Sequence, residues 1–225
     1  MMNALLLFAA SFTAIHLLVS GTRLRGWIVR RIGAGPYMAL FSAASALTLG
    51  GMIWSYLAVR VPQASEWYAL RHLAAVLMWP AIYLILAGGS TPGPTAAGGE
   101  SRLADAEPVT AIHRISRHPF LIGMAIWSGV HLAFNPDWPS RLFFGAFLVV
   151  SVVGTVSIDH KRARQHGAAW LRYAEHSSIL PFAAVLSGRT RMVWSELGWW
   201  RPLAASAIWL LLMYSHGALF RMPLF

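Results

Sequence analysis

The sequence predicts an all-α, polytopic membrane protein: a bundle of about six transmembrane helices. The chain has 225 residues, 57% of them hydrophobic, and its mean hydropathy is +0.55, above that of soluble globular proteins. Apolar stretches close to the roughly 20 residues that cross a bilayer recur along it. We place them at residues 3–20, 37–59, 69–88, 119–135, 141–158 and 203–220. Because they use most of the chain, residues 1–225 are expected to form one transmembrane domain.

The distribution of Lys and Arg predicts the orientation of these helices. Most of the 18 basic residues follow the first, third and fifth spans, and the positive-inside rule places those segments in the cytoplasm, with both termini outside. The exceptions are Arg60, Arg71, Arg141 and Arg221. Topology and anionic lipid headgroups therefore explain the net charge of +10, and no basic soluble surface suggests nucleic acid. We expect an integral protein of the bacterial inner (cytoplasmic) membrane.

The segments between the spans support this arrangement. The first span has no basic residues before it, unlike a signal peptide, so we expect a retained helix. A short basic loop, 21–36, makes the first two helices antiparallel. The loop 61–68 is external. The Gly- and Pro-rich loop at about 89–110 is typical of a flexible cytoplasmic linker, and the segment at about 159–200 is basic and interfacial, with Trp and Tyr expected among lipid headgroups.

The histidines are the candidate functional residues. The chain has 9 His and no Cys, which excludes disulfides, thiolate ligands and covalent c-type haem attachment. His113, His160, His166 and His176 belong to basic cytoplasmic segments, and His72 lies near a helix end. His16, His131 and His216 have apolar neighbours instead. A histidine inside a membrane needs a partner, which is a metal, a proton path or a polar group on another helix.

The fourth predicted helix carries further signals. Gly123, Trp127 and His131 are spaced by four residues and share one face, with Ser128 on an adjoining face. This stripe suits a porphyrin or polyene pocket, and it suits ordinary helix packing equally well. Arg117 and His118 precede the helix at its cytoplasmic mouth, where the fork of an arginine suits a carboxylate such as a haem propionate.

Stretches along most of the chain resemble the NnrU family of bacterial membrane proteins and its relative, the zeta-carotene isomerase of plants and cyanobacteria. The spacing from Arg117-His118-Pro119 to His131 is the most specific of them. The others are His16 with Ser20 and Leu24-Arg25; Gly35-Pro36-Tyr37 with Leu40-Phe41-Ser42; Arg71-His72-Leu73; Ile115-Ser116, Gly123, Trp127 and Asn135; and Asp159 with Arg162, Gly167, Trp170, Ser178 and Pro181-Phe182.

The resemblance implies a non-covalent haem b held by two axial histidines, which match His16 and His131. The isomerase has a cysteine three residues before its second ligand, where this chain has Ser128, so a thiolate switch does not carry over. The NnrU family is linked to denitrification and nitric-oxide metabolism. The implied function is that of a haem-dependent isomerase or oxidoreductase acting on an isoprenoid or on a small oxidised-nitrogen species. Its partners would be the bilayer and a hydrophobic small molecule.

The predicted topology conflicts with this ligand pair. His16 lies near the cytoplasmic end of its helix, whereas His131 is thirteen residues past His118, roughly 20 Å along a helix. The two would differ in depth by about 10 Å. The alternative partners for His131 are His216 and His72, which are both predicted near the outer side.

Two other functions remain open. The Arg-His-Pro start and the later Gly-x-x-Trp-x-x-Tyr pattern are similar to isoprenylcysteine and phospholipid methyltransferases. Those enzymes usually carry paired acidic residues near the end of the following helix to hold the methyl donor, where this chain has Asp159 alone. A non-enzymatic haem or nitric-oxide sensor, or an assembly factor, would use the same haem site as an enzyme.

Overall fold

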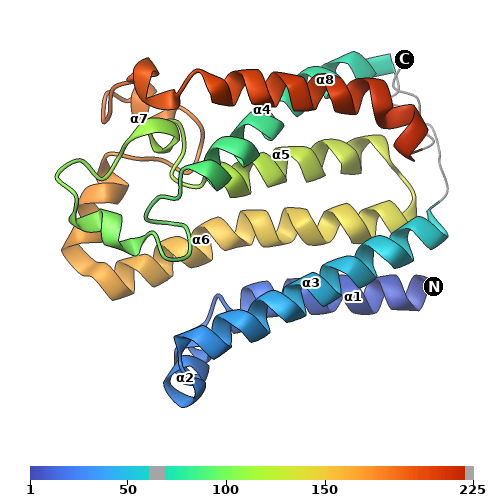
Figure 1. The fold of residues 1–225 in the computed structure, drawn as a ribbon, viewed down its shortest axis with the longest axis horizontal. Coiled ribbons are helices and arrows are strands. Elements are labelled where there is room, and N and C mark those ends of the chain that lie inside the picture. The colour runs from blue at the N-terminus through green and yellow to red at the C-terminus, as the bar shows by residue number, and fades with distance from the viewer. Residues whose placement is uncertain (61–68, 221–225) are drawn as a thin grey trace. The chain divides into compact units, whose positions relative to one another are not determined.

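The computed structural model describes residues 1–60 and 69–220, and all regular structure in these residues is helical (Figure 1). The long helices are α1 (Met2–Ala14), which continues as the π-helix η1 (Ile15–Val19), α2 (Arg23–Ile32), α3 (Ala34–Val59), α4 (Arg71–Ser90), α5 (Pro119–Phe134), α6 (Trp138–Glu175) and α8 (Trp200–Phe220). Short turns are η3 (Glu100–Ala104), η4 (Ala111–Arg114), α7 (Ala183–Leu186) and η5 (Trp194–Leu197). The predicted all-α fold is confirmed.

Within residues 1–60 and 69–220, five helices are long and apolar enough to cross a membrane, and they correspond to five of the predicted spans. The sixth, α5, is apolar but has only 16 residues. It begins at Pro119, and Pro136 lies just beyond its end, where a proline disfavours helical backbone in the residue before it. Many large apolar side chains are exposed on these helices, for example Leu47 at 70%, as expected for surfaces that face lipid. The predicted outer loop 61–68 and Arg221 lie outside the described residues.

The chain divides into two compact units, and the first comprises residues 1–69 and 128–157. Within it α1 and α3 pack side by side (Figure 1). Gly51 permits their close approach, because a Cβ there would lie 2.5 Å from the ring of Phe8. The start of α6 adds aromatic residues to this unit, and Phe147 contacts Phe12 with ring centroids 5.3 Å apart.

The basic segment predicted only as a loop contains the helix α2. Thr22 caps it, because its side chain accepts a hydrogen bond from the Leu24 amide at 3.2 Å, a usual role for threonine at a helix start. Gly33 ends it with a φ of 89°, a conformation that costs glycine little. Leu24 and Trp27 are exposed on this helix.

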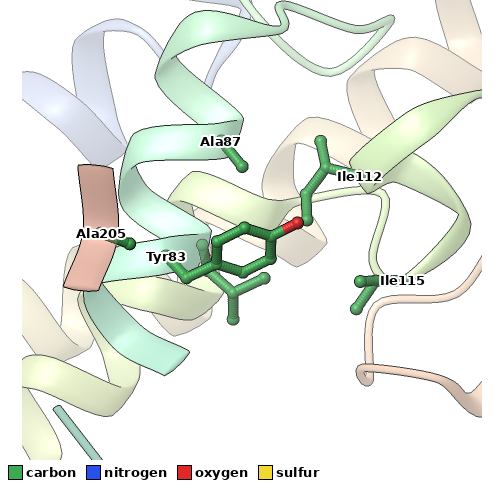
Figure 2. Packing of buried hydrophobic residues seen from close by; sticks show 6 residues of the cluster. Tyr83, Ala87, Ile112, Ile115 and Ala205 are labelled. Atoms are coloured by element: carbon green, nitrogen blue, oxygen red, sulfur yellow. The ribbon is translucent and has the colours of Figure 1, made fainter. Parts of the chain in front are cut away.

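The second unit comprises residues 70–127 and 158–225, described as far as Phe220. Here α4 and α8 pack antiparallel, since Trp79 Nε1 donates to Ser206 Oγ at 3.0 Å and Trp209 Nε1 donates to the Ala75 carbonyl at 2.8 Å. Figure 2 shows the adjoining core, in which the ring of Tyr83 lies among small and branched side chains. Its labelled members are Tyr83, Ala87, Ile112, Ile115 and Ala205.

The segment predicted as a flexible linker has fixed contacts in this unit. Leu103 is buried, and Arg162 Nη1 on α6 pairs with Glu100 Oε1 at 2.5 Å. The predicted flexibility of this linker stays a prediction. Trp170 and Tyr173, which we expected among headgroups, are buried against Leu103 and Val109. The reason is that α6 continues well past the predicted span, to Glu175, with a non-helical residue at Gly167.

Candidate functional site

His16 lies on the π-helix η1, in the first unit. Its Nδ1 is 2.8 Å from the Phe12 carbonyl oxygen, so Nδ1–H donates and Nε2 keeps its lone pair, as in many metal-binding histidines. The imidazole contacts Phe12 at 4.3 Å and Phe41 at 5.3 Å between ring centroids. Short π-helical turns are rare and frequently found at functional sites. In the His16 imidazole, Nδ1 is thus engaged by the backbone, and Nε2 is the nitrogen that this bond leaves unused.

His131 lies near the end of α5, also in the first unit. Its ring stacks on Phe144 of α6, with centroids 4.7 Å apart and planes 26° from parallel. Asn135 fixes the end of the helix here, because its Nδ2 donates to the His131 carbonyl at 2.7 Å.

A row of phenylalanine rings connects the two histidines. From His16 the contacts run through Phe12 to Phe147 at 5.3 Å, then to Phe143 at 5.3 Å, to Phe144 at 5.1 Å and on to His131. The structure thus brings both predicted ligands to one aromatic row without bringing their rings into contact. We call these four phenylalanines and two histidines the aromatic row.

The register of α6 gives the offset between the two histidines. Phe147 contacts Phe12, and Ser157 Oγ donates to the Gly21 carbonyl at 3.2 Å, so the two segments run parallel. His16 then lies level with about residue 151 of α6, while His131 lies level with Phe144. Seven residues correspond to about 10 Å along a helix, so by this count along α6 the two histidines are offset by about that length.

His72 and His216, the alternative ligands, lie in the second unit on α4 and α8. The antiparallel register of those helices places both toward the same end of the pair. The ring of His216 is 4.9 Å from that of Phe220.

A second polar cluster forms around the Arg-His-Pro motif. Both Arg117 Nε and Nη2 donate to Asp159 Oδ2, at 2.9 and 2.5 Å, and His118 Nε2 lies 2.6 Å from Asp159 Oδ1. The remaining Arg117 nitrogen, Nη1, donates to the Ser177 carbonyl at 3.3 Å. The His118 side chain is 1% exposed and that of Asp159 is 13% exposed. Each side-chain nitrogen of Arg117 therefore has an internal partner.

Burial governs the protonation of this cluster. Desolvation lowers the pKa of His118 below its usual 6.5, and this effect outweighs the opposite one of the Asp159 carboxylate. Asp159 was not identified as the partner of Arg117 and His118 from the sequence, although it is the one acidic residue in its stretch of α6. With its carboxylate engaged by Arg117 and His118, it is poorly placed to hold the methyl donor of a methyltransferase.

A cavity of about 300 Å³ adjoins the cluster in the second unit. Its lining includes Gly88, Gly93, Thr95, His113, His118 and Phe120. His113 Nε2 bonds the Thr91 carbonyl at 2.9 Å, and burial lowers the pKa of His113. Mostly apolar walls and neutral imidazoles suit a small uncharged molecule or water.

The other predicted cofactor contacts lie on α5. Gly123 lets α5 approach α4, because a Cβ there would lie 2.7 Å from the Ala81 carbonyl oxygen. Ser128 is fully buried and Trp127 is half-buried. The aromatic row was not expected from the sequence, although the four-residue spacing of Phe143 and Phe147 on one helix face indicates it.

Comparison with known proteins identifies the chain's relatives. Two chloroplastic 15-cis-zeta-carotene isomerases are similar: that of Zea mays is 26% identical over 83 residues, and that of Arabidopsis thaliana is 26% identical over 80 residues. The matches cover 37% and 36% of this chain but only 23% and 22% of those proteins. No solved structure matches. The model of the NnrU protein family matches residues 4–224. With that match covering nearly all of a helical membrane chain, the protein belongs to the NnrU family.

Proposed function

We propose that this chain is an integral-membrane haem b protein of the bacterial inner membrane, with His16 and His131 as axial ligands. One observation carries the proposal: two histidines far apart in the sequence lie in one unit, at the two ends of one aromatic row. Neutral imidazole is a normal axial ligand of haem. Aromatic rings also suit the faces of a flat macrocycle.

The chemistry of these residues fits haem. The offset between His16 and His131 limits how both imidazoles could bind one iron. The Nε2 lone pair of His16 is available for iron, because Nδ1 is bound to the Phe12 carbonyl. Both imidazoles reach one iron only if phenylalanine rings of the aromatic row give way, since the two histidines are offset by about 10 Å along the helices. Haem would supply one-electron chemistry at its iron, while this chain's residues hold it and exclude water from it.

We further propose that the substrate is a hydrophobic isoprenoid that enters from the bilayer. The relatives named as carotene isomerases support this class, and the aromatic row could stack along a polyene. Nitric-oxide-linked redox chemistry of denitrification, or sensing and assembly without turnover, would use the same haem. Only an assay of conversion separates these roles from isomerisation.

The first test is the visible spectrum of the protein purified in mild detergent from haem-replete cells. We expect a Soret band and sharp reduced α and β bands, as for a six-coordinate bis-histidine haem. The variants His16→Ala and His131→Ala should each lose or broaden these bands. His176→Ala is the matched control, because that side chain is exposed just after the end of α6, outside the aromatic row.

Other outcomes discriminate between ligand sets. Loss of the bands in His131→Ala and in His216→Ala or His72→Ala, but not in His16→Ala, would replace His16 as the second ligand. A wild-type protein without a Soret band, even after haem is added back, would refute the haem proposal.

A further inference from the structure

We infer that Arg25 and Tyr37 form a carboxylate site beside His16, which would anchor the propionates of the proposed haem. This inference rests on the proposed function. It assigns the anchoring role to a different pair from Arg117 and His118, which the sequence had suggested. Arg25 lies on α2 and Tyr37 in the first turn and a half of α3.

Three successive contacts link this pair to His16. The His16 and Phe41 rings are 5.3 Å apart, the Phe41 and Tyr37 rings stack at 5.9 Å, and the Arg25 guanidinium carbon lies 5.5 Å from the centre of the Tyr37 ring. All four residues belong to the first unit. A cation and a phenol thus stand together, and the ring of Phe41 connects them to the predicted iron ligand.

Among residues 1–60 and 69–220, neither the Tyr37 hydroxyl nor the Arg25 guanidinium has a hydrogen-bonding or ionic partner. Tyr37 is 4% exposed, and its hydroxyl has no hydrogen-bond partner among residues 1–60 and 69–220. A buried hydroxyl without a partner costs stability, so it calls for a ligand. Arg25 forms no ion pair within the same described residues, and the sequence from residue 1 to 60 contains no Asp or Glu.

The charges of the first unit favour this end of the aromatic row. Asp137 is the only acidic residue in the described part of that unit, and it lies at the His131 end. There Asp137 Oδ2 accepts from Ser140 Oγ at 2.7 Å, and Ser140 lies 3.0 Å from the Tyr56 hydroxyl. A carboxylate would be repelled by Asp137 and attracted by the arginines of α2. Arginine binds carboxylates through two parallel hydrogen bonds, and Tyr37 would add a third.

The ion pairs of the second unit lead to the same assignment. The side chain of Arg117, the sequence-based candidate, donates all its hydrogen bonds to Asp159 and Ser177. Among the described residues, the Arg25 guanidinium has only an aromatic contact to lose. A propionate would therefore displace nothing charged at Arg25, whereas at Arg117 it would compete with a buried carboxylate.

The test is the rate at which haem leaves the protein in detergent, measured by transfer to excess apomyoglobin. We expect Arg25→Gln and Tyr37→Phe to release haem roughly tenfold faster than wild type, the effect of losing a charge-assisted hydrogen bond. Arg30→Gln is the matched control, since it removes an equal charge from the same helix without touching Tyr37. Haem dimethyl ester, which lacks free carboxylates, should leave wild type and Arg25→Gln at equal rates.

Different results would overturn the haem proposal and the carboxylate site. Wild type that takes up no haem would overturn both. Wild type that binds haem, while Arg25→Gln and Tyr37→Phe release it at the rate of Arg30→Gln, would overturn the carboxylate site alone. Because the ester comparison uses unaltered protein, misfolding of a variant cannot hide the answer. Ester and haem leaving wild type at one rate would also overturn the site.

Discussion

Single residues in this protein show how burial sets charge. His113 and His118 are both nearly inaccessible, and desolvation lowers the pKa of each. Asp159 raises the pKa of His118 again without overcoming that effect. The polar end of the second unit therefore holds two imidazoles that are neutral at pH 7.

These histidines predict a pH dependence of stability. Since the pKa of each is lower in the folded protein than the usual 6.5 of the unfolded chain, the unfolded state binds protons first as the pH falls. Stability should be constant above about pH 7.5 and fall below about 6.5, by up to about 1.4 kcal/mol per pH unit for each histidine. The midpoint of thermal unfolding in detergent, followed from pH 8 to pH 5, measures this.

A variant isolates the contribution of His113. In His113→Gln the amide can still donate to the Thr91 carbonyl, so the loss of stability at low pH should become smaller. His176→Gln, which changes an exposed histidine, should leave the profile unchanged. Identical profiles for wild type and His113→Gln would contradict the role of that residue.

At the scale of elements, close approaches between helices depend on glycine. Gly123 and Gly88 both lie where α4 and α5 cross: a Cβ at Gly88 would lie 2.5 Å from the Phe120 amide nitrogen. The nearest neighbour at each position is a backbone atom, which cannot move aside as a flexible side chain can. These glycines therefore fix the distance between the helices that carry the cavity.

Gly123→Leu should destabilise the protein strongly. Overpacking a filled interface typically costs about 1–3 kcal/mol, and here the obstacle is the Ala81 carbonyl of the neighbouring helix. We expect a lower unfolding temperature in a thermal-stability assay in detergent. Gly129→Leu, on the same helix but with open space around the position, is the control. Equal unfolding temperatures for the two variants would show that α4 and α5 are not in such close contact.

The sequence predicted the elements better than the contacts between them. Apolar length located the spans, because a run of lipid-soluble residues needs no partner to be recognised. Periodicity also placed Gly123 and His131 on one helix. The partners of Arg117 and His118 were not predictable, since Asp159 is distant in the sequence and only the fold brings it close. Nor was α2, whose arginines look like an ordinary cytoplasmic loop until Thr22 and Gly33 are seen to cap it.

At the scale of the whole molecule, the lack of cysteine makes the orientation directly testable. The basic segments predict that both termini lie outside and that the segment after α6 lies in the cytoplasm. In intact cells a membrane-impermeant maleimide should label Asn3→Cys. It should label Ser187→Cys only after lysis. Both side chains are exposed, so accessibility within the fold does not limit the reaction. The opposite pattern would invert the topology.

Because His16 lies in a π-helix, the geometry of the aromatic row depends on the number of residues in this segment of the chain. An α-helix turns by about 100° for each residue, and a π-helical turn accommodates roughly one additional residue. A chain one residue shorter between Phe12 and Thr22 would form a plain α-helix there. Everything after the deletion would then be rotated by about 100°, and the imidazole would no longer keep both its carbonyl partner and its neighbours. Conservative substitutions leave the number of residues between Phe12 and Thr22 unchanged. Insertions and deletions are therefore the sequence changes that the segment around His16 tolerates least.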